Sequence, residues 1–133
     1  MEKTDYDFHG KHILLAEDIE VNRTLIALFL EETKVAIDEA ENGLKAVEMF
    51  KSAPDKYKAI LMDIQMPRLD GLSAARQIRA SGLPNARTIP IIAMTGDAQK
   101  EDAELSAQAG MNGHIVKPID IPELLKALSE AMG

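Results

Sequence analysis

Five polar side chains, each placed directly after a short apolar run, have the types needed to bind a cation and handle a phosphoryl group. They are Glu17, Asp18, Asp63, Thr95 and Lys117. Three carboxylates that meet in one site repel one another, so either one takes up a proton or a cation neutralises them. Because the set contains neither His nor Cys, its oxygen ligands suit Mg²⁺ better than zinc. One carboxylate would then attack a phosphoryl donor and form an aspartyl-phosphate, while Lys117 and Thr95 bind phosphoryl oxygens.

Each of these residues also has an ordinary explanation when it is considered alone. A carboxylate after a strand often caps the next helix, as Glu17 or Asp18 would. Asp63 would be a solvated turn residue, Thr95 part of a turn, and Lys117 a surface lysine. The site interpretation prevails because the ordinary explanations require four independent coincidences at the ends of successive strands.

Short apolar segments alternate with longer helical patterns along the chain, which predicts an α/β fold. The predicted strands are His12–Ala16, Val35–Ala40, Ala59–Met62, Ile89–Met94 and Gly113–Val116. The predicted helices are Glu20–Thr33, Gly43–Ser52, Gly71–Ala80, Ala98–Ala109 and Ile121–Met132. This alternation predicts a doubly wound, five-stranded parallel sheet with helices on both faces. Ligands of such sheets bind at the carboxyl ends of the strands, where the polar side chains fall.

The composition limits the class of protein. The 133 residues suit a single domain, and a hydrophobic content of 46% excludes a disordered chain. A net charge of −7 argues against binding to nucleic acid or to anionic lipid. The absence of Cys suits a reducing compartment, and the longest apolar runs, such as Leu25–Leu30, are too short to cross a bilayer. We therefore expect a cytoplasmic protein without nucleic-acid or direct membrane contact.

The motifs around the polar side chains resemble those of the receiver domains of bacterial response regulators. They are Leu-Leu-Ala-Glu-Asp (14–18), Leu-Met-Asp-Ile-Gln-Met-Pro (61–67) followed by Asp70-Gly71, Ala-Met-Thr-Gly (93–96) and Val-Lys-Pro (116–118). Their order and spacing match the family over about residues 11–132. The resemblance implies a flavodoxin-like receiver fold for residues 12–132, with strand order 2-1-3-4-5. Residues 1–11 mix charges without periodicity, which predicts a linker or flexible tail.

The resemblance implies a role for each residue of the site. Asp63 is the implied phosphoacceptor of a two-component phosphorelay, which makes the domain a signalling protein with only autocatalytic phosphorylation and dephosphorylation. The implied Mg²⁺ ligands are Asp18 directly, Glu17 through water, Asp63, and the backbone carbonyl of Gln65. The implied phosphoryl donor is a sensor histidine kinase or a histidine phosphotransfer protein.

The resemblance also implies a conformational switch. Thr95 and Lys117 contact the phosphoryl group, and the Lys117–Pro118 peptide bond is expected to be cis. Phosphorylation is expected to draw the Thr95 hydroxyl inward, and a side chain of strand five rotates into the vacated space. This position carries His114 here, whereas the family usually has Tyr or Phe. A partly exposed edge histidine without a switching role is the alternative that the sequence leaves open.

The helix predicted at Glu20–Thr33 has apolar side chains around roughly 200° of its circumference, more than one core face needs. The side chains predicted to face the core are Val21, Leu25, Leu28 and Phe29. Ile26 and Leu30 would then lie at one edge. We hypothesise that this edge, with Ile19, receives the helical bundle of a histidine kinase or phosphotransfer protein. The alternative is that the last helix covers it.

The run Asp18-Ile-Glu-Val-Asn-Arg23 and the segment before the first strand are typical of receivers attached to hybrid histidine kinases. A domain excised from such a kinase and a natural single-domain regulator both remain open, as does the choice between a monomer and a weak dimer.

Three other functions are less compatible with the sequence. An aspartyl-phosphate phosphohydrolase usually has two aspartates separated by one residue, whereas Ile19 and Glu20 follow Asp18. A nucleotide or flavin module requires a glycine-rich loop after the first strand, where this chain has Glu17 and Asp18. A receiver-like module that has lost phosphorylation is disfavoured because all five site residues are present.

Overall fold

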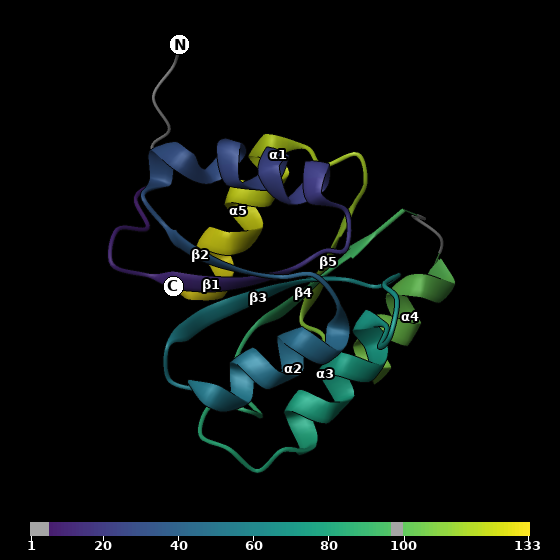
Figure 1. The fold of residues 1–133 in the computed structure, drawn as a ribbon. Coiled ribbons are helices and arrows are strands. Elements are labelled where there is room, and N and C mark those ends of the chain that lie inside the picture. The colour runs from purple at the N-terminus through teal and green to yellow at the C-terminus, as the bar shows by residue number, and fades with distance from the viewer. Residues whose placement is uncertain (1–5, 97–99) are drawn as a thin grey trace.

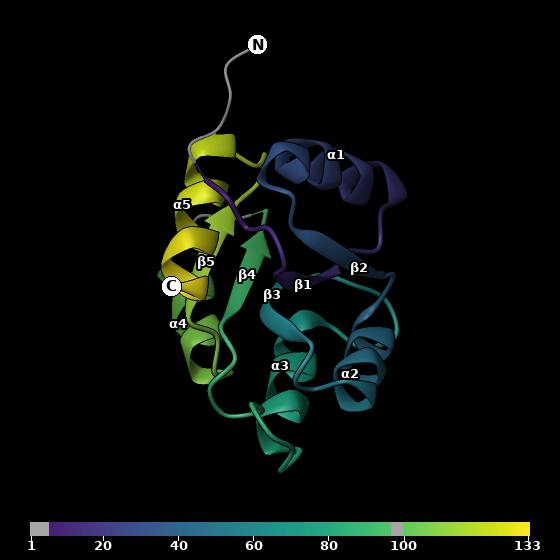
Figure 2. The same ribbon diagram turned by 90° about the vertical axis from the view of Figure 1, so that its left-hand side faces the viewer.

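The computed structural model describes residues 6–96 and 100–133, apart from the side chains of residues 100–103, and shows a parallel sheet between two helical layers (Figure 1). The strands are β1 (His12–Ala16), β2 (Ala36–Ala40), β3 (Tyr57–Asp63), β4 (Ile91–Thr95) and β5 (Gly113–Val116). The helices are α1 (Glu20–Leu30), α2 (Gly43–Ser52), α3 (Gly71–Ala80), α4 (Lys100–Gln108) and α5 (Ile121–Met132). The strand order β2-β1-β3-β4-β5 confirms the expected topology. Helices α1 and α5 cover one face, and α2, α3 and α4 cover the other (Figures 1 and 2).

The central strands are apolar on both sides because both faces of the sheet are covered. In β1, Leu14 and Ala16 pack into the core beneath α2 and α3, whereas Ile13 and Leu15 pack into the core beneath α1 and α5. This alternation is the period of two that a strand imposes on its side chains. Two buried clusters therefore hold the sheet rigidly, and its strand ends become fixed positions for functional groups.

Side-chain caps set the start of two helices where the sequence placed them. The Asn42 carboxamide oxygen accepts a hydrogen bond from Lys45 N at 2.8 Å at the start of α2. The Asp70 carboxylate accepts one from Ser73 N at 2.8 Å at the start of α3. Such caps satisfy backbone donors that a helix leaves unpaired in its first turn.

Other boundaries differ from the predicted ones. β4 begins at Ile91 rather than Ile89, because Pro90 has no N–H to donate to a neighbouring strand. β3 begins at Tyr57 rather than Ala59, since Tyr57 already pairs with His12 of β1. Helix α1 ends at Leu30 and continues as a 3₁₀ turn. Of the helix predicted at Ala98–Ala109, residues 98 and 99 lie outside the described residues.

Three of the four side chains predicted to form the core face of α1 are exposed, whereas the fourth, Phe29, is partly buried and packs against the core beneath α1 and α5. Ile26 and Leu30 are buried, at 2% and 0% exposure, whereas Val21 is 65% and Leu28 58% exposed. Leu25, also assigned to the core, is 43% exposed. The wide apolar arc fits more than one orientation, so periodicity alone did not select the buried side. In the structure Asn22 and Arg23 contact Glu17, which turns the residues one and two helical turns later toward the sheet.

The segment before β1 is packed at Phe8. Its side chain is 4% exposed and belongs to the core beneath α1 and α5. Its backbone N–H donates to Thr33 O at 2.7 Å, and its carbonyl accepts from Lys11 N at 3.0 Å. Phe8 is therefore part of the packed domain, which corrects the prediction of a flexible tail at this position. The outer limits of the domain stay a prediction.

None of the helices within the described part of the chain is both long enough and apolar enough to cross a membrane.

Candidate functional site

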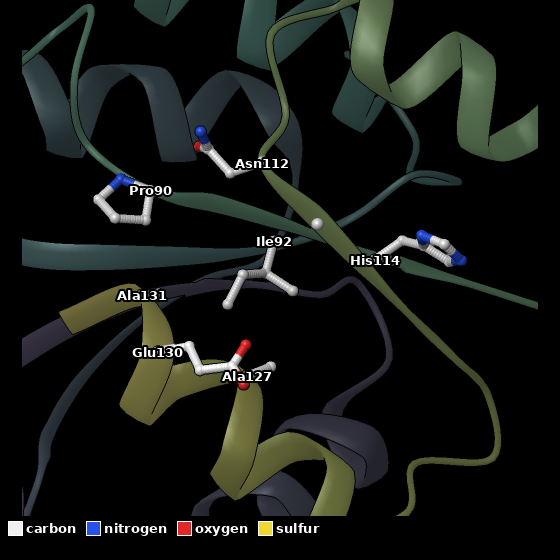
Figure 3. A pocket seen from close by; sticks show the side chains of 8 residues that line it. Pro90, Ile92, Asn112, His114, Ala127, Glu130 and Ala131 are labelled. Carbon is white, nitrogen blue, oxygen red and sulfur yellow. The ribbon is translucent and has the colours of Figure 1, made fainter. Parts of the chain in front are cut away.

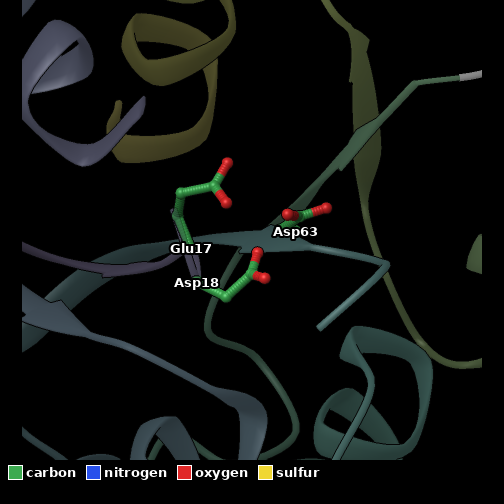
Figure 4. A group of neighbouring side chains, drawn as sticks. All are labelled: Glu17, Asp18 and Asp63. Atoms are coloured by element: carbon green, nitrogen blue, oxygen red, sulfur yellow. The ribbon is translucent and has the colours of Figure 1, made fainter. Parts of the chain in front are cut away.

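The acidic residues meet at the carboxyl end of the two central strands. Glu17 and Asp18 follow β1, and Asp63 is the last residue of β3. Because Ala16 of β1 is paired with Met62 of β3, the residues that follow these two emerge side by side. One carboxylate oxygen from each of the three residues lies within 4.8 Å of the others (Figure 4). The predicted cluster is thus present in the fold.

Lys117, from the loop after β5, brings a positive charge to this cluster. Its ammonium lies 2.7 Å from Glu17 Oε1 and 3.0 Å from Asp63 Oδ2. Glu17 is fully buried and Asp63 is 4% exposed, so both ion pairs are largely shielded from solvent. Charge-assisted hydrogen bonds of this length are strong and directional, and they fix the two carboxylates relative to each other.

The electrostatics of the cluster leave room for a cation. Burial and the neighbouring Glu17 carboxyl raise the pKa of Asp18. Burial by itself lowers the pKa of Lys117, but its hydrogen bonds to Glu17 and Asp63 outweigh burial and raise the pKa overall. One ammonium faces three carboxylates, so negative charge remains in excess. An all-oxygen set with excess negative charge fits a hard divalent cation such as Mg²⁺.

The backbone around Asp63 is held on both sides. Gln65 N donates to Asp63 Oδ1 at 3.1 Å, and Ile64 N donates to Met94 O at 3.0 Å. Gly71, the first residue of α3, lies so close that a Cβ there would be 2.2 Å from the Asp63 carbonyl oxygen. Glycine is therefore required at position 71, which explains the Asp70-Gly71 pair in physical terms. The predicted ligand role of the Gln65 carbonyl stays a prediction.

Thr95 and Lys117 occupy adjacent strand ends. Thr95 ends β4 and is 5% exposed, and its carbonyl accepts a hydrogen bond from Lys117 N at 2.7 Å. The Lys117–Pro118 peptide bond is cis, as predicted. The fold therefore brings five predicted residues to the carboxyl ends of the strands: Glu17, Asp18, Asp63, Thr95 and Lys117.

His114 lies away from these carboxylates, on the edge strand β5. It is exposed, in contrast to the fully buried Ile115 that follows it. Its neighbours include Ala127 and Glu130 of α5, and together they line a depression of about 460 Å³ (Figure 3). The ring points away from the Glu130 carboxylate in this view. A switching role for His114 stays a prediction.

Known proteins with similar sequences and structures support the same assignment as the geometry of the site. The sequence profile of the response regulator receiver domain matches residues 13–129. The chain belongs to this family. Two-component system protein A of Emericella nidulans is 46% identical to this receiver domain over 124 residues, which are 92% of this chain and 18% of that protein. This receiver thus spans less than a fifth of the length of that curated relative.

Two solved receiver structures are similar to this one. The receiver domain of the sensor histidine kinase PA1611 from Pseudomonas aeruginosa, solved with a magnesium ion in the active site cleft, is 41% identical with a TM-score of 0.83. The match covers 93% of this chain and 98% of that chain. The co-crystal structure of the Saccharomyces cerevisiae phosphotransfer protein Ypd1 with the receiver domain of Ssk1 matches at 30% identity and a TM-score of 0.81, covering 92% and 89% of the respective chains.

Two residues of the receiver site have no role predicted from sequence. Asn22 and Arg23 belong to a run typical of receivers attached to hybrid histidine kinases, and both side chains contact Glu17. Asn22 Nδ2 lies 3.4 Å from Glu17 Oε1, and Arg23 Nη1 donates to Glu17 O at 2.8 Å. The available signal was their place in the first turn of the helix that directly follows the acidic pair.

Proposed function

We propose that this receiver domain takes a phosphoryl group onto Asp63 in a Mg²⁺-dependent reaction and passes on a signal by changing conformation. The observation that carries the proposal is the Asp63 carboxylate, which is nearly buried between the Lys117 ammonium and two further carboxylates. A carboxylate held in this way has a defined direction of approach toward an incoming phosphorus atom. Membership of the receiver family supports the same reaction.

In the proposed reaction an oxygen of Asp63 attacks the phosphorus of a phosphohistidine. The new O–P bond forms while the P–N bond breaks, and the imidazole of the donor leaves with the electron pair and is protonated. The Lys117 ammonium, 3.0 Å from Asp63 Oδ2, is close enough to follow the charge onto a phosphoryl oxygen. Thr95 supplies a hydroxyl to a second oxygen. Bound at Glu17, Asp18, Asp63 and the Gln65 carbonyl, Mg²⁺ would offset the charge of the phosphoryl oxygens.

Hydrolysis returns the site to its starting state. Water attacks the phosphorus of the acyl phosphate, the O–P bond to Asp63 breaks, and inorganic phosphate leaves. In both steps the catalytic side chains belong to the receiver, and the phosphohistidine or water is the reactant, so the domain acts as a signalling phosphoacceptor with autocatalytic phosphorylation and dephosphorylation.

Acetyl phosphate tests the proposal directly. Incubation with acetyl phosphate and Mg²⁺ should add one phosphate to the chain by intact mass, and the added mass should be lost in base. Addition of EDTA or the substitution Asp63→Asn should prevent it. A phosphate that persists in Asp63→Asn would contradict the assignment of the phosphoacceptor.

We further propose that the phosphoryl donor docks on α1 beside the site. Ile19, Leu25 and Leu28 are 51%, 43% and 58% exposed. Leu25 also lines an apolar pocket of about 170 Å³ that reaches Glu17 and Pro118. A helix of a histidine kinase domain or histidine phosphotransfer protein would cover this surface and bring its phosphohistidine next to Asp63. The structure buries Ile26, so this surface replaces the edge hypothesised from the sequence.

Leu25→Ser tests the docking surface, and Leu44→Ser of α2 is its matched control because both leucines are 43% exposed. With phosphorylated Ypd1 as donor, Leu25→Ser should slow phosphoryl transfer about tenfold, as expected for loss of an apolar anchor. Transfer from acetyl phosphate should slow far less. An equal loss in Leu44→Ser would exclude α1 as the docking surface.

A further inference from the structure

The backbone of the acidic pair Glu17–Asp18 is bound by Arg23, a side chain that has no part in the reaction described above. Arg23, in the first turn of α1, donates from Nη1 to the Glu17 carbonyl at 2.8 Å. Its Nε lies 3.2 Å from Glu39 Oε1 on β2. The Arg23 side chain is 16% exposed, whereas that of Glu39 is 47% exposed. One guanidinium therefore joins β2, the end of β1 and the start of α1.

We propose that Arg23 is a positioning residue that fixes the Glu17–Asp18 peptide so that both carboxylates face the divalent cation; the inference rests on the proposed function. The Glu17 carbonyl belongs to the peptide that leads into Asp18. Its direction therefore sets where the Asp18 side chain starts. The Glu17 side chain is held independently, by Lys117 at Oε1 and by Ile19 N at Oε2, 3.2 Å away. The Asp18 carboxyl interacts with the neighbouring Glu17 carboxyl and with its own backbone, so the direction of the peptide matters most for this residue.

The shape of the guanidinium explains why arginine suits this role. Nη1 and Nε lie in one rigid plane, so one guanidinium donates to the backbone carbonyl from Nη1 and forms an ion pair with Glu39 through Nε. A lysine ammonium is a point charge on a flexible stem and cannot reproduce this fixed fork. Groups that orient metal ligands from outside the ligand set commonly change metal affinity by about tenfold or more when they are removed.

The sign of the effect separates positioning from simple electrostatics. Replacing Arg23 by Gln removes a positive charge near the acidic cluster, so electrostatics alone predicts tighter binding of Mg²⁺. Loss of positioning predicts weaker binding. Glu39→Gln is the matched control: it removes a negative charge and the exposed ion pair but leaves the hydrogen bond from Arg23 to Glu17 O. Electrostatics predicts weaker binding for Glu39→Gln, and positioning predicts little change.

The test is a Mg²⁺ titration of the whole chain, followed by calorimetry and by the backbone amide NMR signals of residues 17 and 18. Arg23→Gln should weaken Mg²⁺ binding about tenfold. Arg23→Lys should recover only part of the affinity, and Glu39→Gln should stay within about twofold of the wild type. Urea unfolding in EDTA provides the structural readout. If a variant lost stability while keeping its Mg²⁺ affinity, Arg23 would be a structural residue only.

The outcomes also separate this inference from the proposed function. If the wild type binds no Mg²⁺, the proposed function is wrong. If the wild type binds Mg²⁺ and Arg23→Gln binds it equally or more tightly, only the positioning role is wrong. If Arg23→Gln does not fold, Arg23→Lys, which keeps the charge, takes its place. Weaker Mg²⁺ binding by Arg23→Lys than by the wild type supports the positioning role, and equal binding contradicts it.

Discussion

A basic side chain binds residues at each end of the sheet, Lys117 at the carboxyl end and Arg79 at the amino end. The two side chains have different kinds of partner. At the carboxyl end, Lys117 contacts the Glu17 and Asp63 carboxylates. At the amino end, Arg79 of α3 donates to Gly110 O from two nitrogens, at 2.9 and 2.7 Å, and to Ala86 O at 3.2 Å. Arg79 also donates to the Asn112 carboxamide oxygen at 2.8 Å. Lys117 therefore meets charged side chains, and Arg79 meets neutral oxygens of the backbone and of one amide side chain.

On the proposed function, the contacts of Lys117 are exchanged for others during the reaction, whereas the contacts of Arg79 are kept. When bound, a metal ion would satisfy the Glu17 and Asp63 oxygens in place of Lys117, and a phosphoryl group would draw the ammonium to itself. Neither group would replace Arg79, since its partners are neutral oxygens in the loops before β4 and β5: two backbone carbonyls and the Asn112 carboxamide. Burial lowers the pKa of Arg79, yet an arginine stays protonated in proteins. On the proposed function, the contacts at the carboxyl end therefore change during the reaction, whereas those at the amino end do not.

The largest change in the free energy of unfolding should come from Phe8, which packs into the core beneath α1 and α5 at the amino end of the sheet. Phe8→Ala leaves a cavity in a core where the side chain is 4% exposed, so the free energy of unfolding should fall by about 3–4 kcal/mol. Urea unfolding followed by circular dichroism measures it. His9→Ala, at an exposed neighbouring position, is the control. A loss below about 1 kcal/mol would mean that the amino end does not depend on this packing.

Arg79→Gln should cost about 2–3 kcal/mol of unfolding free energy, because two backbone carbonyls lose a charged donor. Arg76→Gln, at an exposed position on the same helix, should change it by about 0.5 kcal/mol or less. Excess Mg²⁺ should not restore the stability of Arg79→Gln. Restoration by Mg²⁺ would break the proposed distinction between the two ends.

Lys117→Gln should behave in the opposite way. In EDTA the unfolding free energy should fall by about 1–2 kcal/mol, since two shielded carboxylates lose their ammonium. Excess Mg²⁺ should restore most of this loss, because a ligand that binds only the folded state stabilises it. The measurement is urea unfolding in EDTA and in Mg²⁺. Equal stability of the variant in both buffers would show that the cation does not share these oxygens.

The smallest effect concerns an ion pair at the amino end. Asp38 Oδ2 lies 2.7 Å from Lys56 Nζ and accepts a hydrogen bond from the Tyr57 hydroxyl at 2.7 Å. The hydrogen bond from Lys56 lowers the pKa of Asp38; burial opposes this, and the bond from Tyr57 adds to it. Wild type should therefore exceed Asp38→Asn in stability at neutral pH by about 1 kcal/mol or less. The difference should vanish as the pH falls from the ordinary aspartate pKa of 3.8 through the lowered pKa.

Unfolding free energies measured from neutral to acid pH check this prediction. When Lys56→Met is present in both proteins, the stability difference between the chain with Asp38 and its Asp38→Asn variant should lose most of its pH dependence. The reason is that Lys56 is the main cause of the lowered pKa. A difference that grows in acid would have the wrong sign for a lowered pKa.

The carboxyl end was predictable from sequence, and the amino end was not. In a parallel sheet the carboxyl ends of all strands lie on the same side, so the topology alone brings Glu17, Asp63 and Lys117 to that side. Identifying the strands was therefore enough to predict the cluster. Arg79 has no such signal, because its partners are mainly backbone carbonyls and Gly110 lies 31 residues away along the chain. Phe8 lies between Asp7 and His9, in a segment without the periodicity that indicates burial.

Helix α1 shows a second limit of sequence patterns. Its apolar side chains surround most of the helix, so hydrophobic periodicity fits several orientations equally well. The polar contacts of Asn22 and Arg23 with Glu17 fix the orientation instead, and they bury Ile26 and Leu30. These contacts join residues whose pairing becomes apparent only when the end of β1 and the start of α1 are seen in space.

The close contact between Gly71 and the Asp63 carbonyl makes the first turn of α3 and the backbone of Asp63, the proposed phosphoacceptor, a single mechanical unit. Gly71 N also donates to Ile64 O at 2.8 Å, which closes the intervening loop into a ring. A shift of the Asp63 backbone would therefore push directly on the axis of α3. Strain at Asp63 would then pass along α3 to the far end of the domain, where Arg79 binds the loops that lead into β4 and β5.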